Sequence, residues 1–354
     1  MESAYQIVPY EARMGDGVVR VLRHLWGKDD DGNRAYFRWK YEDNPYRQGP
    51  PGGVALHHDT VVGFRGYFAT RWAVANQGEL LVLGAGDTCV SPDHRRKGLS
   101  VALGEAALAT CTKGARLLVN TSSSRSSAPG YRRLGFVPVA DRTYLHRYSL
   151  PKLAWYVAAT KLGITASARR SAGASACGLV VSDVPDVEAM ARLVAEAPAR
   201  PALAIVRDKT LFAWRFANPR SRYLFYFLRP LGSLLAYVAL RLPRGGRRGF
   251  VIDYAERSPG VLERLIPLVT KAGHADVFSV WACGTQPDDR VAFEHGGFRP
   301  GGLLGAIDGK ISGERPILVR PSTARPSEAD WFVHGLDVRK SSNWRFLELA
   351  SDAA

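Results

Sequence analysis

Two short motifs occur twice along the chain, in the same order. FRWKY at 37–41 is echoed by FAWRF at 212–216, and each copy is soon followed by Asn-Pro. YRRLGFVP at 131–138 is echoed by FEHGGFRP at 293–300. Ordered echoes with similar separations indicate a duplicated unit rather than chance. The chain of 354 residues is long enough for two such units, so the sequence predicts tandem mixed α/β domains of about 150 residues each.

The segment from Asp87 to Leu103 reads as a strand, a basic turn and a helix. The run LLVLGAGDTCV at 80–90 predicts the strand, and apolar residues recur at helical spacing from Leu99 onward. Backbone N–H groups at the start of a helix have no intrahelical partner and, with the helix dipole, can bind phosphate. Basic side chains strengthen such a site. We therefore predict an anion cradle made of Arg95, Arg96, Lys97, Gly98, Leu99 and Ser100.

A second motif follows about thirty residues later. GARLLVN at 114–120 predicts a short strand, and APGYRRLGF at 128–136 predicts a helix that carries Tyr131 and ends at Gly135. Glycine suits the left-handed position that follows a helix.

Together, RRKGLS at 95–100 and YRRLGF at 131–136 resemble the two signatures of the GNAT superfamily of acyl-CoA-dependent N-acyltransferases, Q/R-x-x-G-x-G/A and Y-x-x-x-G-F. Ser100 departs from the final Gly/Ala but keeps a small side chain. The resemblance covers roughly residues 55–139, and its wider pattern is similar to a branch of two-domain GNAT proteins that includes enhanced-intracellular-survival-type acetyltransferases.

This resemblance implies a mixed α+β, GNAT-like fold of the α/β class. We expect two tandem domains, each with a central mixed, mostly antiparallel sheet flanked by helices. The expected division is a catalytic domain at 1–150, a basic linker at 151–178 and a degenerate GNAT-like domain at 179–354.

The resemblance also implies a reaction. A short acyl group, expected to be acetyl, would pass directly from acyl-CoA to an amine without a covalent intermediate. The backbone of Thr88, Cys89 and Val90 would hold the acyl-pantetheine arm. Tyr131 is the candidate general acid for the leaving thiolate. The alternative is that Tyr131 only packs beside the pantetheine.

The general base is less evident. Asp87 lies on the strand before the cradle, where a buried carboxylate needs a partner, so a proton-accepting role and a structural role both stay open. Glu79 is the alternative base, and His94 is expected to face phosphate or solvent. Direct transfer and the lack of an evident histidine partner argue against Cys89 as a nucleophile.

For the acceptor site, the aromatic stretch WKYEDNPY at 39–46 supplies Trp39, Glu42 and Asp43. The two carboxylates could hold a cationic amine, but solvated or turn-capping roles are favoured. Amino sugars, antibiotics, peptides and sugar hydroxyls all remain candidate acceptors. A non-catalytic acyl-CoA sensor or scaffold is the alternative function, and the serine-rich stretch at 122–127 gives it some weight.

The second half differs where chemistry would take place. The strand-like stretch at 248–255 runs into a helix, and we find no R-x-x-G-x-G turn between them. Phe293 stands at the position of Tyr131. We therefore predict that only the first half binds acyl-CoA.

Composition limits the partners. The formal net charge is +15, yet no nucleic-acid-binding signature is present, so no nucleic-acid partner is expected. Four widely spaced cysteines predict neither a metal site nor a disulfide framework. The N-terminus lacks the apolar core of a signal peptide, and the expected compartment is the cytoplasm. The oligomeric state stays open.

The basic amphipathic stretch that begins at Leu150 has two interpretations. It could lie on an anionic membrane surface through residues 152–172. We favour a linker helix docked against one domain, because most amphipathic helices bury their apolar stripe in protein.

Overall fold

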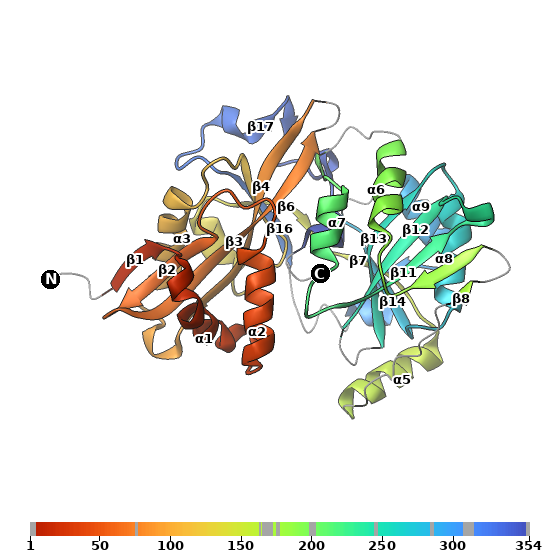
Figure 1. Cartoon of the computed structure of the whole chain (residues 1–354), viewed down its shortest axis with the longest axis horizontal. Helices are drawn as coiled ribbons and strands as arrows, with labels where there is room; N and C mark the ends of the chain where they lie inside the picture. The colour runs from red at the N-terminus through yellow and green to blue at the C-terminus, as the bar shows by residue number, and fades with distance from the viewer. Residues whose placement is uncertain are drawn as a thin grey trace. The chain divides into compact units, whose positions relative to one another are not determined.

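The computed structural model describes residues 5–74, 77–162, 164, 173–174, 178–197, 203–243, 247–283, 287–306 and 315–351. Contacts divide the chain into two compact units (Figure 1). Unit 1 comprises Met1–Asp141 and Arg315–Asn343, and unit 2 comprises Arg142–Glu314 and Trp344–Asp352.

Unit 1 is built on a mixed sheet in which β4 and β5 run parallel and the other neighbours in the strand order below run antiparallel. Its strand order is β1 (Tyr5–Pro9), β2 (Gly52–His57), β3 (Thr60–Val74), β4 (Glu79–Val90), β5 (Leu117–Asn120), β16 (Pro316–Pro321) and β6 (Val137–Asp141). A short hairpin, β17 (Phe332–Val333) and β18 (Leu336–Asp337), belongs to the same unit.

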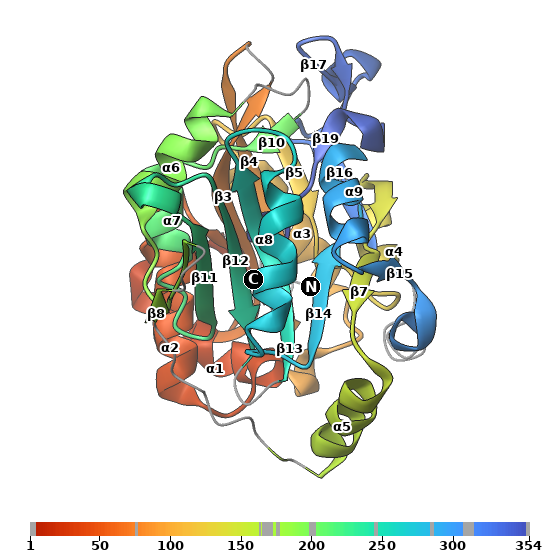
Figure 2. The same cartoon turned by 90° about the vertical axis from the view of Figure 1, so that its right-hand side faces the viewer.

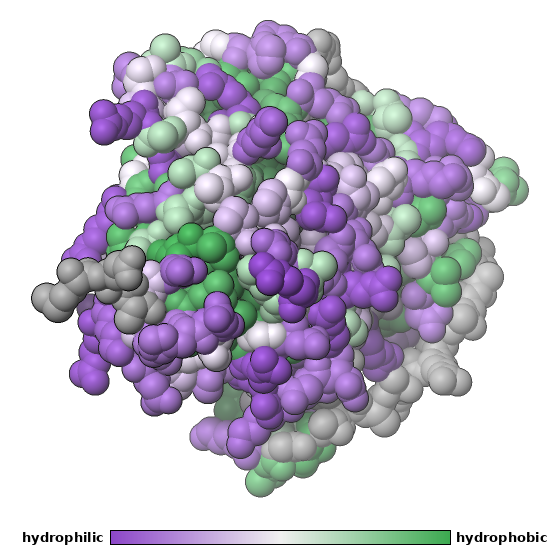
Figure 3. Space-filling model, turned by 60° about the vertical axis from the view of Figure 1, so that its left-hand side comes forward, coloured by the Kyte–Doolittle hydropathy of each residue, from purple (hydrophilic) through white to green (hydrophobic). Residues whose placement is uncertain are grey.

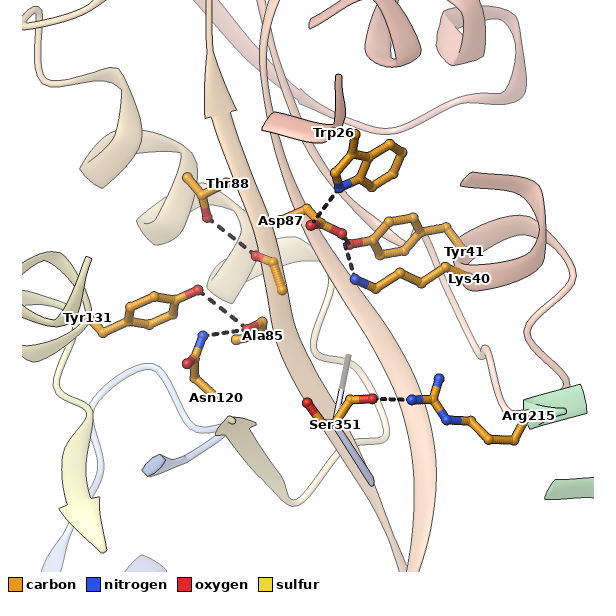
Figure 4. A network of polar contacts seen from close by, with 11 residues as sticks. Trp26, Lys40, Tyr41, Ala85, Asp87, Thr88, Asn120, Tyr131, Arg215 and Ser351 are labelled. Carbon is orange, nitrogen blue, oxygen red and sulfur yellow. Dashed lines mark hydrogen bonds and ion pairs between the residues drawn. The ribbon is translucent and has the colours of Figure 1, made fainter. Parts of the chain in front are cut away.

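Helices cover both faces of this sheet. Their bounds are α1 (Gly15–Trp26), α2 (Asp30–Phe37), α3 (Leu99–Thr110) and α4 (Ala128–Arg133), and a π-helical turn, η2 (Arg38–Glu42), continues α2. In Figure 4, α1 and α2 lie on one side of β4, and α3 and α4 lie on the other. In α3, Leu99, Leu103 and Ala107 are buried at i, i+4 and i+8, which is the apolar stripe that the sequence predicts.

Unit 2 repeats this plan with a second mixed sheet, in which only β13 and β14 run parallel. Its strand order is β15 (Arg299–Pro300), β7 (Tyr144–Arg147), β14 (Val277–Trp281), β13 (Arg248–Glu256), β12 (Ala236–Leu242), β11 (Arg222–Leu228), β9 (Leu179–Ser182) and β8 (Gly173–Ala174). A further parallel pair joins β10 (Leu203–Ile205) to β19 (Trp344–Arg345).

The helices of unit 2 are α5 (Leu150–Lys161), α6 (Val187–Glu196), α7 (Lys209–Arg215), α8 (Val261–Lys271) and α9 (Pro287–His295). Figure 2 shows α8 lying across the face of this sheet. Aspartates begin two of them: Asp186 accepts a hydrogen bond from the Ala189 N–H, and Asp208 accepts one from the Leu211 N–H, as N-caps do.

The two sheets confirm the tandem, mixed α/β fold. Each sheet has a β-bulge in one antiparallel strand pair. The β3/β4 register shifts between Arg65 and Tyr67, and the β12/β13 register shifts between Ala239 and Leu240. Asp87 and Asp253 lie at these two bulges. The duplication seen in the motifs therefore extends to backbone irregularities.

Each unit also contains one strand from the other half of the sequence. The expected division at residues 150 and 178 does not include these two strands. β16, from late in the chain, lies between β5 and β6, whereas β7 lies between β14 and β15. Unit 1 therefore ends at Asp141 and regains Arg315–Asn343. Pairing between segments so distant in sequence leaves no local signal.

Helix α5 is docked within unit 2. Leu153 is buried in a cluster with Val277 and Leu304, and Arg247 lies 5.1 Å from the ring centroid of Trp155. These contacts match the favoured linker interpretation. Much of the expected linker, including Arg169 and Arg170, lies outside the described residues.

The surface in Figure 3 is largely hydrophilic, with a compact hydrophobic area. Within the described ranges, we find no helix with the length and apolar character needed to cross a bilayer.

Candidate functional site

The predicted cradle is a left-handed turn that leads into α3. Gly98 is the N-cap with a φ of 76°, and Arg96 also has a positive φ, of 62°. A Cβ placed on Gly98 would meet no heavy atom within 4 Å. In the described part of the chain, the backbone N–H groups of residues 96–100 have no acceptor, as expected for the start of a helix. The turn therefore presents open, unpaired donors.

Basic side chains surround these donors. Arg95 is exposed and its Nε donates to the Val90 carbonyl at 2.9 Å. The Lys97 Nζ donates to the Tyr5 hydroxyl at 2.9 Å, and that hydroxyl also lies 3.0 Å from His94 Nδ1. Tyr5 thus positions two side chains of the cradle. His94, which was expected to face phosphate or solvent, contacts the ring and the hydroxyl of Tyr5.

Next to the cradle, β4 parts from β5. The last pair between them is Gly84 with Val119, while β4 continues to Val90. We call the stretch of β4 beyond this last pair, residues 85–90, the splay. One edge of the splay has no strand partner among the described strands. Thr88, Cys89 and Val90 lie on this stretch and pair with β3 on the other edge. An extended ligand could add to the free edge.

Two side chains meet at the start of the splay (Figure 4). The Ala85 carbonyl accepts hydrogen bonds from Asn120 Nδ2 at 2.6 Å and from the Tyr131 hydroxyl at 3.4 Å. Asn120 ends β5, and Tyr131 lies on α4, before Gly135 with its φ of 81°. The Tyr131 hydroxyl is therefore held where β4 and β5 separate.

Asp87 lies on the opposite face of β4 and has three donors (Figure 4). Its carboxylate accepts hydrogen bonds from Lys40 Nζ at 2.6 Å, the Tyr41 hydroxyl at 2.7 Å and Trp26 Nε1 at 3.0 Å. Burial alone would raise the pKa of Asp87, but the charge of Lys40 and these hydrogen bonds hold it below its ordinary value. A carboxylate stabilised in this way is a poor proton acceptor.

The other base and nucleophile candidates also have partners. Glu79 forms a half-exposed ion pair with Arg71 at 2.9 Å. The Cys89 thiol donates to the Val21 carbonyl at 3.2 Å, and burial raises its pKa. A thiol with a raised pKa forms little thiolate at neutral pH, which agrees with the argument against a nucleophilic Cys89.

The three predicted acceptor-site residues are all engaged within unit 1. Trp39 is buried and stacks on Tyr36 with ring centroids 5.4 Å apart. Glu42 accepts a hydrogen bond from the Tyr10 hydroxyl at 2.6 Å. Burial is the main reason that the pKa of Tyr10 is raised, and this hydrogen bond raises it further. Asp43 forms an exposed ion pair with Arg38 at 3.0 Å. Contact of these residues with an acceptor stays a prediction.

Three residues that the sequence did not single out line the site: Lys40, Arg65 and Asn120. Lys40 is 2% exposed, and its position inside an aromatic stretch is the only sequence signal for its burial. Asn120 is a buried polar residue at the end of the apolar strand β5. Arg65 is one of two arginines in the long strand β3, and its side chain is also buried.

Unit 2 has a turn that the sequence analysis missed. Gly260 is the N-cap of α8 with a φ of 89°, a left-handed glycine that the search for R-x-x-G-x-G did not single out. The stretch Arg257-Ser258-Pro259-Gly260 fits R-x-x-G, but the last position of the signature is Leu262, which is buried. The Glu256 carboxylate accepts the Leu262 N–H at 2.8 Å. The chain's own anion therefore occupies the start of α8.

In the described ranges, no group of three or more His, Cys, Asp or Glu side chains is arranged to hold a metal ion.

The comparisons with known proteins agree with this geometry. Residues 9–139 match the family model described as "Acetyltransferase (GNAT) domain". No curated protein matches the sequence.

Solved structures share the fold at low identity. A GCN5-related N-acetyltransferase from Kribbella flavida is similar with a TM-score of 0.58 and 15% identity, over 90% of this chain and 71% of that one. Saccharomyces cerevisiae N-myristoyltransferase with bound myristoyl-CoA gives 0.58 and 14%, over 98% and 85%. A tandem GNAT protein from the clavulanic acid biosynthesis pathway gives 0.51 and 14%, over 92% and 100%.

Proposed function

We propose that this chain moves a short acyl group, acetyl, from acetyl-CoA to an amine, because residues 9–139 match the model of the GNAT acetyltransferase domain, a family that transfers acyl groups from acyl-CoA. The acceptor would be a small molecule, an amino sugar or a peptide. Transfer would take place directly between the two bound substrates, in unit 1 alone.

The observation that carries this proposal is the open turn at Gly98 beside the splay. Unpaired N–H groups at the start of α3, together with Arg95, Arg96 and Lys97, suit the diphosphate of coenzyme A. The free edge of β4 at Thr88, Cys89 and Val90 suits the amide groups of pantetheine. One structural neighbour was solved with myristoyl-CoA bound, which supports a coenzyme A thioester as the donor.

Tyr131 would act on the leaving group. Its hydroxyl donates at 3.4 Å to the Ala85 carbonyl, where β4 and β5 part. When the amine attacks the thioester, the carbon–sulfur bond breaks, and the sulfur takes the phenol proton. The proton lost by the amine passes to water. Asp87 would serve as a structural carboxylate, because its three donors stabilise the charged form.

A thiol-release assay tests the proposal. Purified protein is mixed with acetyl-CoA and a panel of primary amines, and free coenzyme A is measured against amine-free controls. We expect amine-dependent thiol release that Arg95→Glu weakens by raising KM for acetyl-CoA. Arg222→Glu makes the same charge change on an exposed residue of unit 2 and should have no effect. Tight acetyl-CoA binding with no release for any amine would instead favour the acyl-CoA sensor.

A further inference from the structure

Among the described residues, Arg65 is a buried cation without a carboxylate partner. Its side chain is on β3 and the residue is 3% exposed. Its hydrogen bonds go to two neutral oxygens, from Nε to the Tyr67 hydroxyl and from Nη1 to Thr88 Oγ1, both at 3.3 Å. Nη2 is buried and has no partner. A buried charge normally needs an opposite charge to offset its lost hydration.

The group that Arg65 faces is the phenol of Tyr131. The guanidinium carbon lies 4.6 Å from the ring centroid of Tyr131, and 5.7 Å from that of Tyr67. Burial lowers the pKa of Arg65, but the phenols of Tyr131 and Tyr67 more than offset this and leave it above its ordinary value. Arg65 therefore remains charged over the whole working range of an enzyme.

We infer that Arg65 makes Tyr131 an effective proton donor by stabilising the phenolate that remains after the proton has left. The inference rests on the proposed acyl transfer. In that step the O–H bond of Tyr131 breaks as the S–H bond of coenzyme A forms. The negative charge passes from sulfur to the phenolate beside Arg65, and water later returns a proton.

A carboxylate is not needed beside this arginine for the proposed role. A permanent anion would neutralise Arg65 before the reaction, whereas a phenol becomes an anion only during proton transfer. Low local polarity strengthens the attraction between the guanidinium and a phenolate. Arg65 acts through Tyr131 and is thus a positioning residue.

Five variants test the inference: Arg65→Met, Arg65→Lys, Tyr131→Phe, the combination of Arg65→Met with Tyr131→Phe, and Arg71→Met as a matched control. Arg71 is on the same strand and also lies over a tyrosine ring, that of Tyr46 at 5.2 Å, but it is paired with Glu79. We expect Arg65→Met to lower kcat about tenfold with unchanged acetyl-CoA affinity. In the Tyr131→Phe background the same change should lower kcat less than about twofold. Arg65→Lys should restore most of kcat.

Stability gives a second readout. Because Arg65 is an unpaired buried charge, Arg65→Met should leave the Tm unchanged or raise it. A variant that fails to fold or melts far lower would show a structural role and overturn the inference. Equal kcat losses from Arg65→Met with and without the Tyr131 hydroxyl would also overturn it.

A third measurement does not depend on activity. Carbon NMR of tyrosine labelled at Cζ, with the Tyr131 signal assigned from Tyr131→Phe, follows ionisation of the phenol directly. The phenol should ionise at higher pH in Arg65→Met than in the wild-type chain or Arg71→Met. If the Tyr131 phenol ionises at higher pH in Arg65→Met than in wild type, but the wild-type chain transfers no acyl group, only the proposed function fails. If the wild-type chain transfers acyl groups, but the Tyr131 phenol ionises at the same pH in Arg65→Met and in wild type, only this inference fails.

Discussion

The Nζ of Lys40 lies 2.6 Å from the carboxylate of Asp87, and these side chains are only 2% and 10% exposed. They are 47 residues apart in sequence. The pair joins η2 to β4 on the face opposite Tyr131, and it fixes the strand that carries Thr88, Cys89 and Val90.

Loss of this pair should destabilise the protein strongly. Asp87→Asn leaves the Lys40 ammonium buried without its counter-charge, so the free energy of unfolding should fall by about 3–5 kcal/mol. Asp43→Asn removes an exposed ion pair with Arg38 and should cost less than about 1 kcal/mol. Urea unfolding of both variants makes the comparison, and similar small losses would mean that the buried pair contributes little.

The stabilising effect of Asp87 should depend on pH in one direction. The folded pKa of Asp87 lies below its ordinary value of about 3.9. Its contribution is therefore fully present above that value and is lost as the pH falls through the lower, folded pKa. The difference in unfolding free energy between wild type and Asp87→Asn should stay constant from about pH 6 to 8 and shrink below about pH 4. A difference that grew on acidification would contradict the assignment.

Removal of the Tyr131 hydroxyl should affect chemistry rather than binding. Tyr131→Phe should lower kcat about 100-fold, because a positioned general acid contributes on this scale. The dissociation constant for acetyl-CoA should change little. Steady-state thiol release and calorimetry measure the two quantities. Unchanged turnover would show that the ring only packs beside the pantetheine.

The start of α8 should be stabilised by Glu256. Glu256→Ala leaves the Leu262 N–H without its 2.8 Å acceptor and should lower stability by about 1 kcal/mol, as loss of an N-terminal cap does. Glu263→Ala, on the same helix, removes an exposed contact with His295 and should have a smaller effect. Acetyl-CoA affinity should be equal in both variants, and a change in either would place a coenzyme site in unit 2.

Local chemistry explains which features the sequence predicted. Gly135 adopts the left-handed conformation expected after a helix, because that preference is set within a few residues. Gly260 escaped notice because the signature was required to end in a small residue. Its backbone conformation depends only on the glycine.

Long-range contacts explain what the sequence did not reveal. The Lys40–Asp87 pair joins two segments that are distant in sequence, and Arg65 on β3 packs against Tyr131 of α4. The insertion of β16 between β5 and β6 pairs segments that are more than 170 residues apart in sequence. Neither motifs nor periodicity carry this information, because each partner alone looks like an ordinary charged residue or apolar strand.

The most direct test of the account is a calorimetric titration with coenzyme A of wild type, Gly98→Val and Gly260→Val. The two glycines are matched, since both are left-handed N-caps and a Cβ on either would meet nothing within 4 Å. We predict one site per chain, at least about tenfold weaker binding for Gly98→Val, and wild-type affinity for Gly260→Val. Two sites per chain, or wild-type affinity in Gly98→Val, would contradict the assignment of the coenzyme site to residues 95–100.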